Sequence, residues 1–161
     1  MDKKLIKAFN DQIKNELASS YLYLSMAAYF EAENLSGFAR WMKAQAKEEV
    51  GHAMKLFGHL IERGARVELQ AIPQPEIKFS SAAGVFEKTL AHEKKVTALI
   101  NKLYELANTV SDYPASILLQ WFISEQVEEE STADSILQNL KKIKPDSSAM
   151  LMYDQVMGKR E

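Results

Sequence analysis

The sequence predicts an all-α fold, a four-helix bundle with a long crossover between helices 2 and 3 and a short fifth C-terminal helix. Glycine and proline are scarce among the 161 residues and cluster at a few positions, which leaves four long uninterrupted segments. Each segment carries a stripe of mostly apolar side chains at alternating steps of three and four. That spacing stacks side chains on one face of a helix, so each segment is predicted to bury one face.

The first helix is expected over about residues 2–33 and the second over about residues 36–63. Ser36 is a candidate N-cap for the second helix, and Gly64 is typical of a residue that ends one. Because the turn between the two segments is short, we expect the two helices to lie antiparallel.

Residues 65–80 include Pro73 and Pro75 and show no helical pattern, so we expect a long connection there. Sixteen extended residues reach up to about 50 Å, whereas a 28-residue helix is about 42 Å long. The connection can therefore cross the whole bundle, which replaces the simple up-down-up-down order by an order with one long crossover.

The third helix is expected over about residues 81–110 and the fourth over about residues 114–143. The fixed φ of Pro114 suits the first turn of a helix, and the short turn before it makes these helices a second antiparallel pair. Either of the first two residues of the segment 146–157 can act as an N-cap for a short fifth helix.

Composition predicts a single domain over residues 1–161 and excludes several classes of protein. The net charge of −2 leaves no basic face for nucleic acid. The absence of cysteine excludes disulfides, thiolate zinc sites and iron–sulfur clusters. The sequence begins without the apolar region of a signal peptide, and no stretch is long enough to span a bilayer. We therefore expect a cytoplasmic protein that binds neither membrane nor nucleic acid.

Near the middle of each long helix, acidic, amide or imidazole groups interrupt the apolar stripe. In an antiparallel bundle these interruptions meet at one level, and burying several carboxylates together without a counter-charge is very unfavourable. Divalent cations remove that cost. Oxygen-rich ligands with one imidazole favour iron or manganese, and the pair Glu49 and His52 places both donor types on one helix face, one turn apart.

The two halves of the chain repeat this arrangement at equal spacing. Thirty-three residues separate the carboxylate of the first helix from an i, i+3 pair in the second, and 33 also separate the corresponding groups of the third and fourth helices. The matched residues are Glu16, Glu49 and His52 in the first half, and Glu93, Gln126 and Glu129 in the second. This weak internal repeat predicts a dinuclear site with pseudo-two-fold symmetry.

Five segments also carry a family resemblance. They are residues 15–23 (NELASSYLY), 48–53 (EEVGHA), 92–93 (HE), 119–122 (LQWF) and 125–130 (EQVEEE). On these segments the chain resembles the non-haem ferritins of the bacterial and archaeal type over essentially its full length. The resemblance implies the ferritin-like bundle, whose single long crossover agrees with the loop argument above.

The resemblance further implies a catalytic diiron centre within each chain. Glu16, Glu49 and His52 would bind the first iron, with Glu49 bridging to the second. The remaining residues of the centre would be Glu93 and Glu129 as ligands of the second iron, Gln126 lining the centre, and Tyr23 beside it. Tyr23 would hydrogen-bond a ligand and could donate an electron.

Bacterial members of this family have a third iron site nearby. In this chain that site would draw on Glu48, Glu125, Glu128 and Glu129. Haem is not expected, because the family of haem-containing relatives has a methionine directly after the second-helix glutamate, where this chain has Val50.

The activity implied by the resemblance is oxidation of Fe(II) to Fe(III) by O2 or H2O2 and storage of the product as a ferric oxyhydroxide mineral. Twenty-four copies would close into a hollow shell. Two other readings are a diiron peroxidase or oxygenase, for which the sequence shows no dedicated electron-donor site, and a structural shell subunit, for which ligand residues should be missing. A DNA-protecting ferritin with ligands shared between subunits is disfavoured by a ligand set within one chain.

Overall fold

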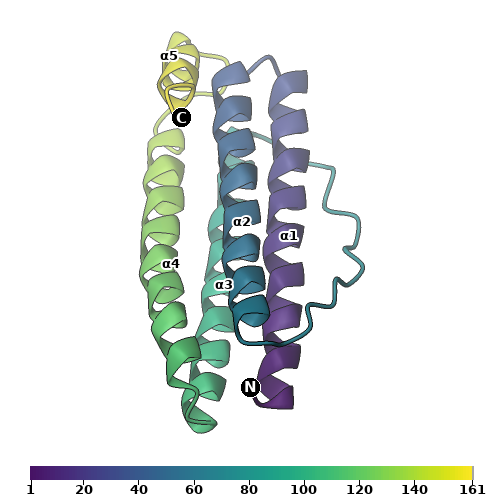
Figure 1. Cartoon of the computed structure of the whole chain (residues 1–161). Coiled ribbons are helices and arrows are strands. Elements are labelled where there is room, and N and C mark those ends of the chain that lie inside the picture. The colour runs from purple at the N-terminus through teal and green to yellow at the C-terminus, as the bar shows by residue number, and fades with distance from the viewer. Residues whose placement is uncertain (161) are drawn as a thin grey trace.

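The computed structural model describes residues 1–160, and within that range the chain folds into five helices and no strand. The helices are α1 (Lys3–Ala32), α2 (Ser36–Glu62), α3 (Ala82–Thr109), α4 (Tyr113–Leu140) and α5 (Ser148–Met157). The four long helices stand side by side as a bundle, and α5 lies at one end of it (Figure 1). The all-α bundle predicted from the sequence is therefore confirmed. None of the helices in the described range combines the length and the apolarity needed to cross a membrane.

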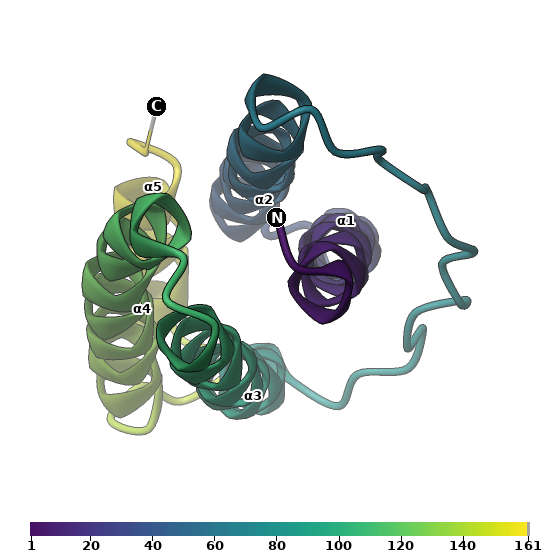
Figure 2. The ribbon, with the colours of Figure 1, turned by 60° about the horizontal axis from the view of Figure 1, so that its bottom comes forward.

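The connection between α2 and α3 runs the length of the bundle on the outside of α1, as Figures 1 and 2 show. As a result α2 and α3 run in the same direction, while α1 with α2 and α3 with α4 are antiparallel pairs. Polar side chains of α1 hold the connection in place. Asn10 accepts a hydrogen bond from the backbone N–H of Glu68 (2.8 Å) and donates one to the carbonyl of Arg66 (3.2 Å), and Ser25 donates to the carbonyl of Glu76 (2.6 Å).

The start of α2 differs from the prediction that Ser36 is its N-cap. Ser36 is the first helical residue, and Leu35 occupies the cap position without a side-chain hydrogen bond. The preceding Asn34 has a left-handed φ of 57°, and the carboxylate of Asp154 in α5 accepts a hydrogen bond from the backbone N–H of Phe38 (2.9 Å). A distant residue therefore satisfies the helix terminus that a local serine was expected to satisfy.

The other helices begin with side-chain N-caps from their own sequence neighbours, as is usual for Ser and Asp. These caps are Asp2 for α1, Ser81 for α3, Asp112 for α4 and Ser147 for α5.

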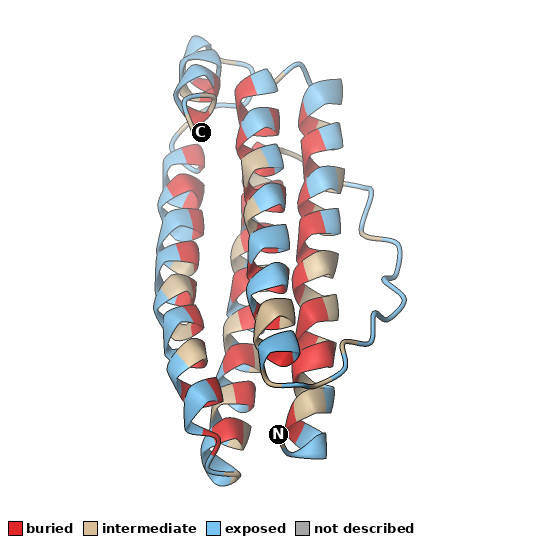
Figure 3. Cartoon of the chain, viewed as in Figure 1, coloured by how far each residue is buried: buried red, intermediate tan, exposed pale blue. Residues whose placement is uncertain are grey.

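The inward faces of the four long helices are buried along their whole length (Figure 3). The apolar core consists of two clusters. One lies toward α5 and contains Phe30, Phe38 and Phe86, and the other lies toward the start of α1 and contains Phe9 and Leu56. Buried polar side chains from all four helices lie between the two clusters, so the polar layer is held by apolar packing on both sides.

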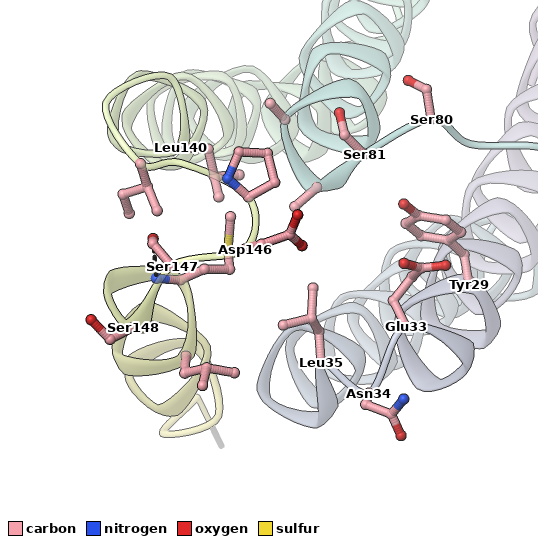
Figure 4. Close-up of a pocket in the computed structure, with 16 residues that line it drawn as sticks. Tyr29, Glu33, Asn34, Leu35, Ser80, Ser81, Leu140, Asp146, Ser147 and Ser148 are labelled. Carbon is pink, nitrogen blue, oxygen red and sulfur yellow. Dashed lines mark hydrogen bonds between the residues drawn. The ribbon is translucent and has the colours of Figure 1, made fainter.

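A hollow of about 660 Å³ opens at the α5 end of the bundle. It lies where the turn after α1, the start of α3 and the segment before α5 meet, and Tyr29, Leu35 and Asp146 are among its lining residues (Figure 4). None of the residues predicted for the metal centre lines it. The predicted centre is instead part of the packed interior.

Candidate metal centre

The polar layer of the bundle contains every residue that the sequence predicts for the diiron centre. Each lies on the inward stripe of its helix, one or two turns from apolar core residues on either side. The four carboxylates are at most 7% exposed. The buried residues are Glu16 and Tyr23 from α1, Glu49 and His52 from α2, Glu93 from α3, and Gln126 and Glu129 from α4.

In the first half of the chain, three of these side chains form a compact set of metal donors. Ligand atoms of Glu16, Glu49 and His52 all lie within 4.8 Å of one another. His52 Nδ1 is 3.6 Å from Glu49 Oε2, and Gln12 Nε2 donates a hydrogen bond of 2.8 Å to Glu16 Oε1. Two carboxylates and one imidazole so placed provide a donor set suited to a divalent first-row metal.

In the second half of the chain, hydrogen bonds from other side chains hold the carboxylates. The hydroxyl of Tyr23 donates to Glu93, and Gln126 Nε2 also donates to Glu93 Oε2 at 3.2 Å. Glu129 accepts a hydrogen bond of 2.8 Å from Gln45 Nε2, which belongs to α2. The amide and phenol groups thus orient the second pair of carboxylates toward the centre of the layer.

Burial and mutual repulsion raise the pKa of all four carboxylates. Burial, followed by the charge of Glu49, raises the pKa of Glu16 to about 8. Burial, followed by the charge of Glu93, raises the pKa of Glu129 to about 7. The pKa values of Glu49 and Glu93 are raised above their ordinary value, again chiefly by burial. Ionising this cluster near neutral pH is therefore unfavourable without cations, and cations bound between the carboxylates would supply the missing charge.

A second group of metal donors adjoins the first on its α4 side. Ligand atoms of Glu48, His52, Glu125 and Glu129 lie within 4.8 Å of one another. His52 belongs to both groups, so the two sets of donors share an edge. Glu48 and Glu125 are half-buried, whereas Glu128 is exposed and lies outside the group. Three of the four residues predicted for a third iron site are thus brought together.

A model of the ferritin-like domain family matches residues 6–143 of this chain. The chain belongs to the ferritin family. It is 38% identical to the bacterial non-heme ferritin of Staphylococcus aureus (strain USA300), over 160 residues that cover 99% of this chain and 96% of the relative. It is 36% identical to the corresponding protein of Staphylococcus epidermidis, over the same shares of both chains.

The fold agrees with that of solved ferritins. Superposition on an open-pore ferritin from the hyperthermophilic archaeon Archaeoglobus fulgidus gives a TM-score of 0.98 at 42% identity, covering 100% of this chain and 98% of the other. A humanized archaeal ferritin gives the same TM-score and identity. The resemblance to non-haem ferritins of the bacterial and archaeal type, inferred from five short segments, is therefore confirmed over the full chain.

Two amides of this ferritin were not predicted as part of its centre. Gln12 donates to Glu16, and Gln45 donates to Glu49 (3.3 Å) as well as to Glu129. Each glutamine precedes its glutamate by four residues, and the two glutamines are 33 residues apart, like the glutamates that they hold. The internal repeat therefore extends one turn further than the ligands, a signal that the sequence already contained.

The two other histidines of this ferritin contact groups outside the metal centre. His92 Nε2 is 2.7 Å from the hydroxyl of Ser19, and burial lowers the pKa of His92 to about 4. His59 stacks on Phe9 with the ring centroids 5.2 Å apart. Neither belongs to a group of metal donors in the described residues.

Proposed function

We propose that this chain oxidises Fe(II) to Fe(III) at a dinuclear centre within each subunit, with O2 or H2O2 as oxidant, and stores the product as ferric oxyhydroxide inside a hollow shell of 24 copies. One observation carries the proposal. Four buried carboxylates and one imidazole, contributed by all four helices, meet in one layer, and the pKa values of the carboxylates are raised in the absence of cations.

The proposed division of ligands follows the two halves of the chain. Glu16, Glu49 and His52 would bind one Fe(II), and Glu93 and Glu129 would bind the other, with Glu49 positioned to bridge. Carboxylates suit a substrate that changes oxidation state, because hard oxygen ligands stabilise the Fe(III) product. They also exchange between terminal and bridging modes, so the product can leave the centre.

The reaction requires an oxidant that takes up the electrons of Fe(II), and protons that balance the charge. Two Fe(II) lose one electron each, and O2 takes up the two electrons with two protons to give H2O2. With H2O2 as oxidant, two Fe(II) supply the two electrons that reduce it, with two protons, to two molecules of water. Binding of Fe(II) displaces the protons that the raised carboxylate pKa values retain on Glu16 and Glu129, so protons are available where the oxidant is reduced. Gln126 and Tyr23 would hold Glu93 in position during these steps.

Apolar side chains on the outside of the bundle support assembly into a larger particle. Tyr113 and Leu69 are each 71% exposed, and Ile117 is 69% exposed. A soluble chain that presents large apolar groups commonly covers them in symmetric contacts with further copies.

The test is a stopped-flow measurement of ferric absorbance in the near ultraviolet after the metal-free protein is mixed aerobically with two Fe(II) per chain. Sedimentation of the same sample gives the particle mass. We expect a rapid phase that saturates at two Fe(II) per chain, in a particle of about half a megadalton. Glu49→Gln, which keeps the side-chain size, should abolish the rapid phase.

Glu105→Gln is the matched control, because Glu105 is exposed on α3 and lies outside the centre. It should leave both the rapid phase and the particle mass unchanged. Slow oxidation that does not saturate, by a small oligomer, would contradict storage and favour a diiron peroxidase.

A further inference from the structure

The C-terminal segment, residues 158–160, follows α5 and is fixed against α2. The carboxylate of Asp154 caps the start of α2 at the N–H of Phe38. At Gly37 an added Cβ would lie 1.7 Å from the carbonyl oxygen of Asp154, so the two helices approach as closely as only glycine allows. Arg40 donates a hydrogen bond of 3.3 Å to the carbonyl of Gly158. Lys159 and Arg160 are therefore directed along α2 toward the metal centre.

Arg160 ends this path in three contacts on one face of α2. Its guanidinium lies over the ring of Trp41, 4.3 Å from the centroid, donates a hydrogen bond of 2.6 Å to Gln45 Oε1, and forms an ion pair with Glu48. The three partners follow each other at steps of four and three residues, so they lie in a row on the helix. A planar guanidinium uses its flat face on the first partner and its N–H groups on the other two.

These contacts tie Arg160 to both groups of metal donors. Glu48 is a member of the group that also contains His52, Glu125 and Glu129. Gln45, whose oxygen accepts from Arg160, uses its Nε2 to donate to Glu129 and Glu49. We call the group with Glu48 the outer group and the group with Glu16 the inner group. Arg160 thus places a positive charge on Glu48 of the outer group and orients the amide of Gln45, which holds Glu49 of the inner group.

The surroundings of the segment favour this position for the arginine. Arg40, Lys43 and Lys47 line a shallow depression beside residues 158–160. Arg160 itself belongs to the lining of this basic depression, and its ion pair with Glu48 supplies an acidic partner among these like charges. The ion pair is half-exposed, with side-chain exposures of 26% for Arg160 and 39% for Glu48. Its strength is therefore modest, and a divalent cation can compete with it.

We propose that Arg160 is a tethered cation that competes with the third iron for Glu48, so that metal binding at the outer group releases the C-terminal segment. The inference rests on the third iron site of the proposed function. In the absence of the third metal, Arg160 neutralises Glu48 and holds Gln45 toward Glu129. When the metal binds, the guanidinium leaves Glu48, and Gln45 loses the contact that orients it.

The test is calorimetric titration of the assembled, metal-free protein with Zn(II), a divalent probe that undergoes no redox reaction. Arg160→Gln should bind the third equivalent about two- to fivefold more tightly than the unchanged protein, the upper part of the range expected for a half-exposed ion pair. Lys159→Gln removes the same charge one residue earlier, from an exposed side chain, and should change that affinity less than twofold. Glu125→Gln should weaken the third equivalent and leave the first two.

Release of the segment can be measured separately, because the chain has no cysteine and accepts a single nitroxide label at Lys159→Cys. We expect a restricted label in the metal-free protein that becomes mobile as the third Zn(II) binds, and a label that is mobile throughout when Arg160→Gln is added. If Glu125→Gln removes the third equivalent but Arg160→Gln matches Lys159→Gln, the role of Arg160 is overturned while the third site stands. If neither the unchanged protein nor any variant binds a third equivalent of Zn(II), the third site and the role of Arg160 are both overturned, and the proposed diiron centre is unaffected.

Discussion

The two halves of the chain present matched residues at equal spacing, yet the structure holds them differently. In the first half, ligand atoms of Glu16, Glu49 and His52 lie within 4.8 Å of one another. In the second half, Glu93 accepts hydrogen bonds from Tyr23 and Gln126, and Glu129 accepts one from Gln45. The first half therefore gathers its ligand atoms into one compact set of donors, whereas in the second half hydrogen bonds from Tyr23, Gln126 and Gln45 hold the two carboxylates.

An internal repeat can therefore keep the positions of the ligands while their types and their hydrogen-bond partners differ. His52 of the first half corresponds to the carboxylate Glu129 of the second, and the acid Glu49 corresponds to the amide Gln126. A cation entering the first half meets three donors that are already close, and each of its carboxylates accepts one hydrogen bond from a glutamine. In the second half the ligand atoms of Glu93 accept from both Tyr23 and Gln126, so binding there exchanges more protein hydrogen bonds for metal bonds. We therefore expect unequal, ordered binding of two Fe(II), which suits a substrate that must leave after oxidation.

The largest expected effect comes from removing the imidazole that distinguishes the first half. His52→Gln should weaken binding of the first Fe(II) by about 100-fold, because even disruption of outer hydrogen bonds at metal sites costs up to about that factor. The second Fe(II) should change by less than tenfold. Anaerobic calorimetry with Fe(II) measures both steps. As a control, His59→Gln removes a histidine outside the centre and should change neither step. If His52→Gln weakened the first and the second Fe(II) equally, the two halves would not bind iron separately.

The pH dependence of the metal-free protein gives the next effect, since each half contains a carboxylate with a raised pKa. Glu16 has a pKa of about 8 and Glu129 one of about 7, against ordinary values of 4.5. The stability that each protonated group contributes is present below about pH 4.5 and is lost as pH rises through its folded pKa. Glutamine stays neutral and avoids this loss. Glu16→Gln and Glu129→Gln should therefore each stabilise the metal-free protein by several kcal/mol at pH 8, on the order of 3 to 4 kcal/mol, and by little at pH 4.5.

Chemical denaturation at a series of pH values checks this prediction. The gain of Glu129→Gln should level off near pH 8, whereas that of Glu16→Gln should still be rising there, because its carboxyl ionises about one pH unit later. A pH-independent gain in either variant would show that the effect comes from packing and not from ionisation. Glu105→Gln, exposed on α3, is the control without a buried charge.

The sequence predicted the parts of this comparison that depend on local spacing. Steps of three and four residues identify the inward face of a helix, so the positions of Glu16 and Glu49 in one layer followed from the pattern and the antiparallel pairing. Contacts between distant segments could not follow from spacing. The capping of α2 by Asp154 replaced the expected cap at Ser36, and the approach of Arg160 to Glu48 depends on how α5 docks. Local periodicity carries no information about either contact.

The third effect comes from a substitution that makes the two halves more alike, because it supplies the acid that the second half lacks at Gln126. Gln126→Glu should tighten the second Fe(II) by about tenfold, because a carboxylate binds a hard cation better than an amide does. The same change removes a donor to Glu93 and adds a buried charge, so the metal-free protein should unfold at lower denaturant concentration at pH 8. Gln138→Glu, on the exposed face of α4, is the matched control: it should leave Fe(II) binding unchanged and, through its exposed contact with Asp134, lower stability by only about 0.5 kcal/mol. Tightening of the first Fe(II) alone would contradict the assignment of Gln126 to the second half.

The smallest effect concerns the hydroxyl of Tyr23, which the second half uses and the first does not. Tyr23→Phe removes the donor to Glu93 while keeping the ring, which belongs to the same buried apolar cluster as Met26. Loss of one buried hydrogen bond should destabilise the metal-free protein by about 1 kcal/mol. Because Glu93 is then less well oriented, the second Fe(II) should bind a few-fold more weakly and the first should be unchanged. Tyr21→Phe, half-exposed on the same helix, controls for the loss of a phenol. If Tyr23→Phe weakened binding of the first Fe(II) as much as that of the second, the hydroxyl would support the whole polar layer. The two halves would then differ only through His52 and Gln126.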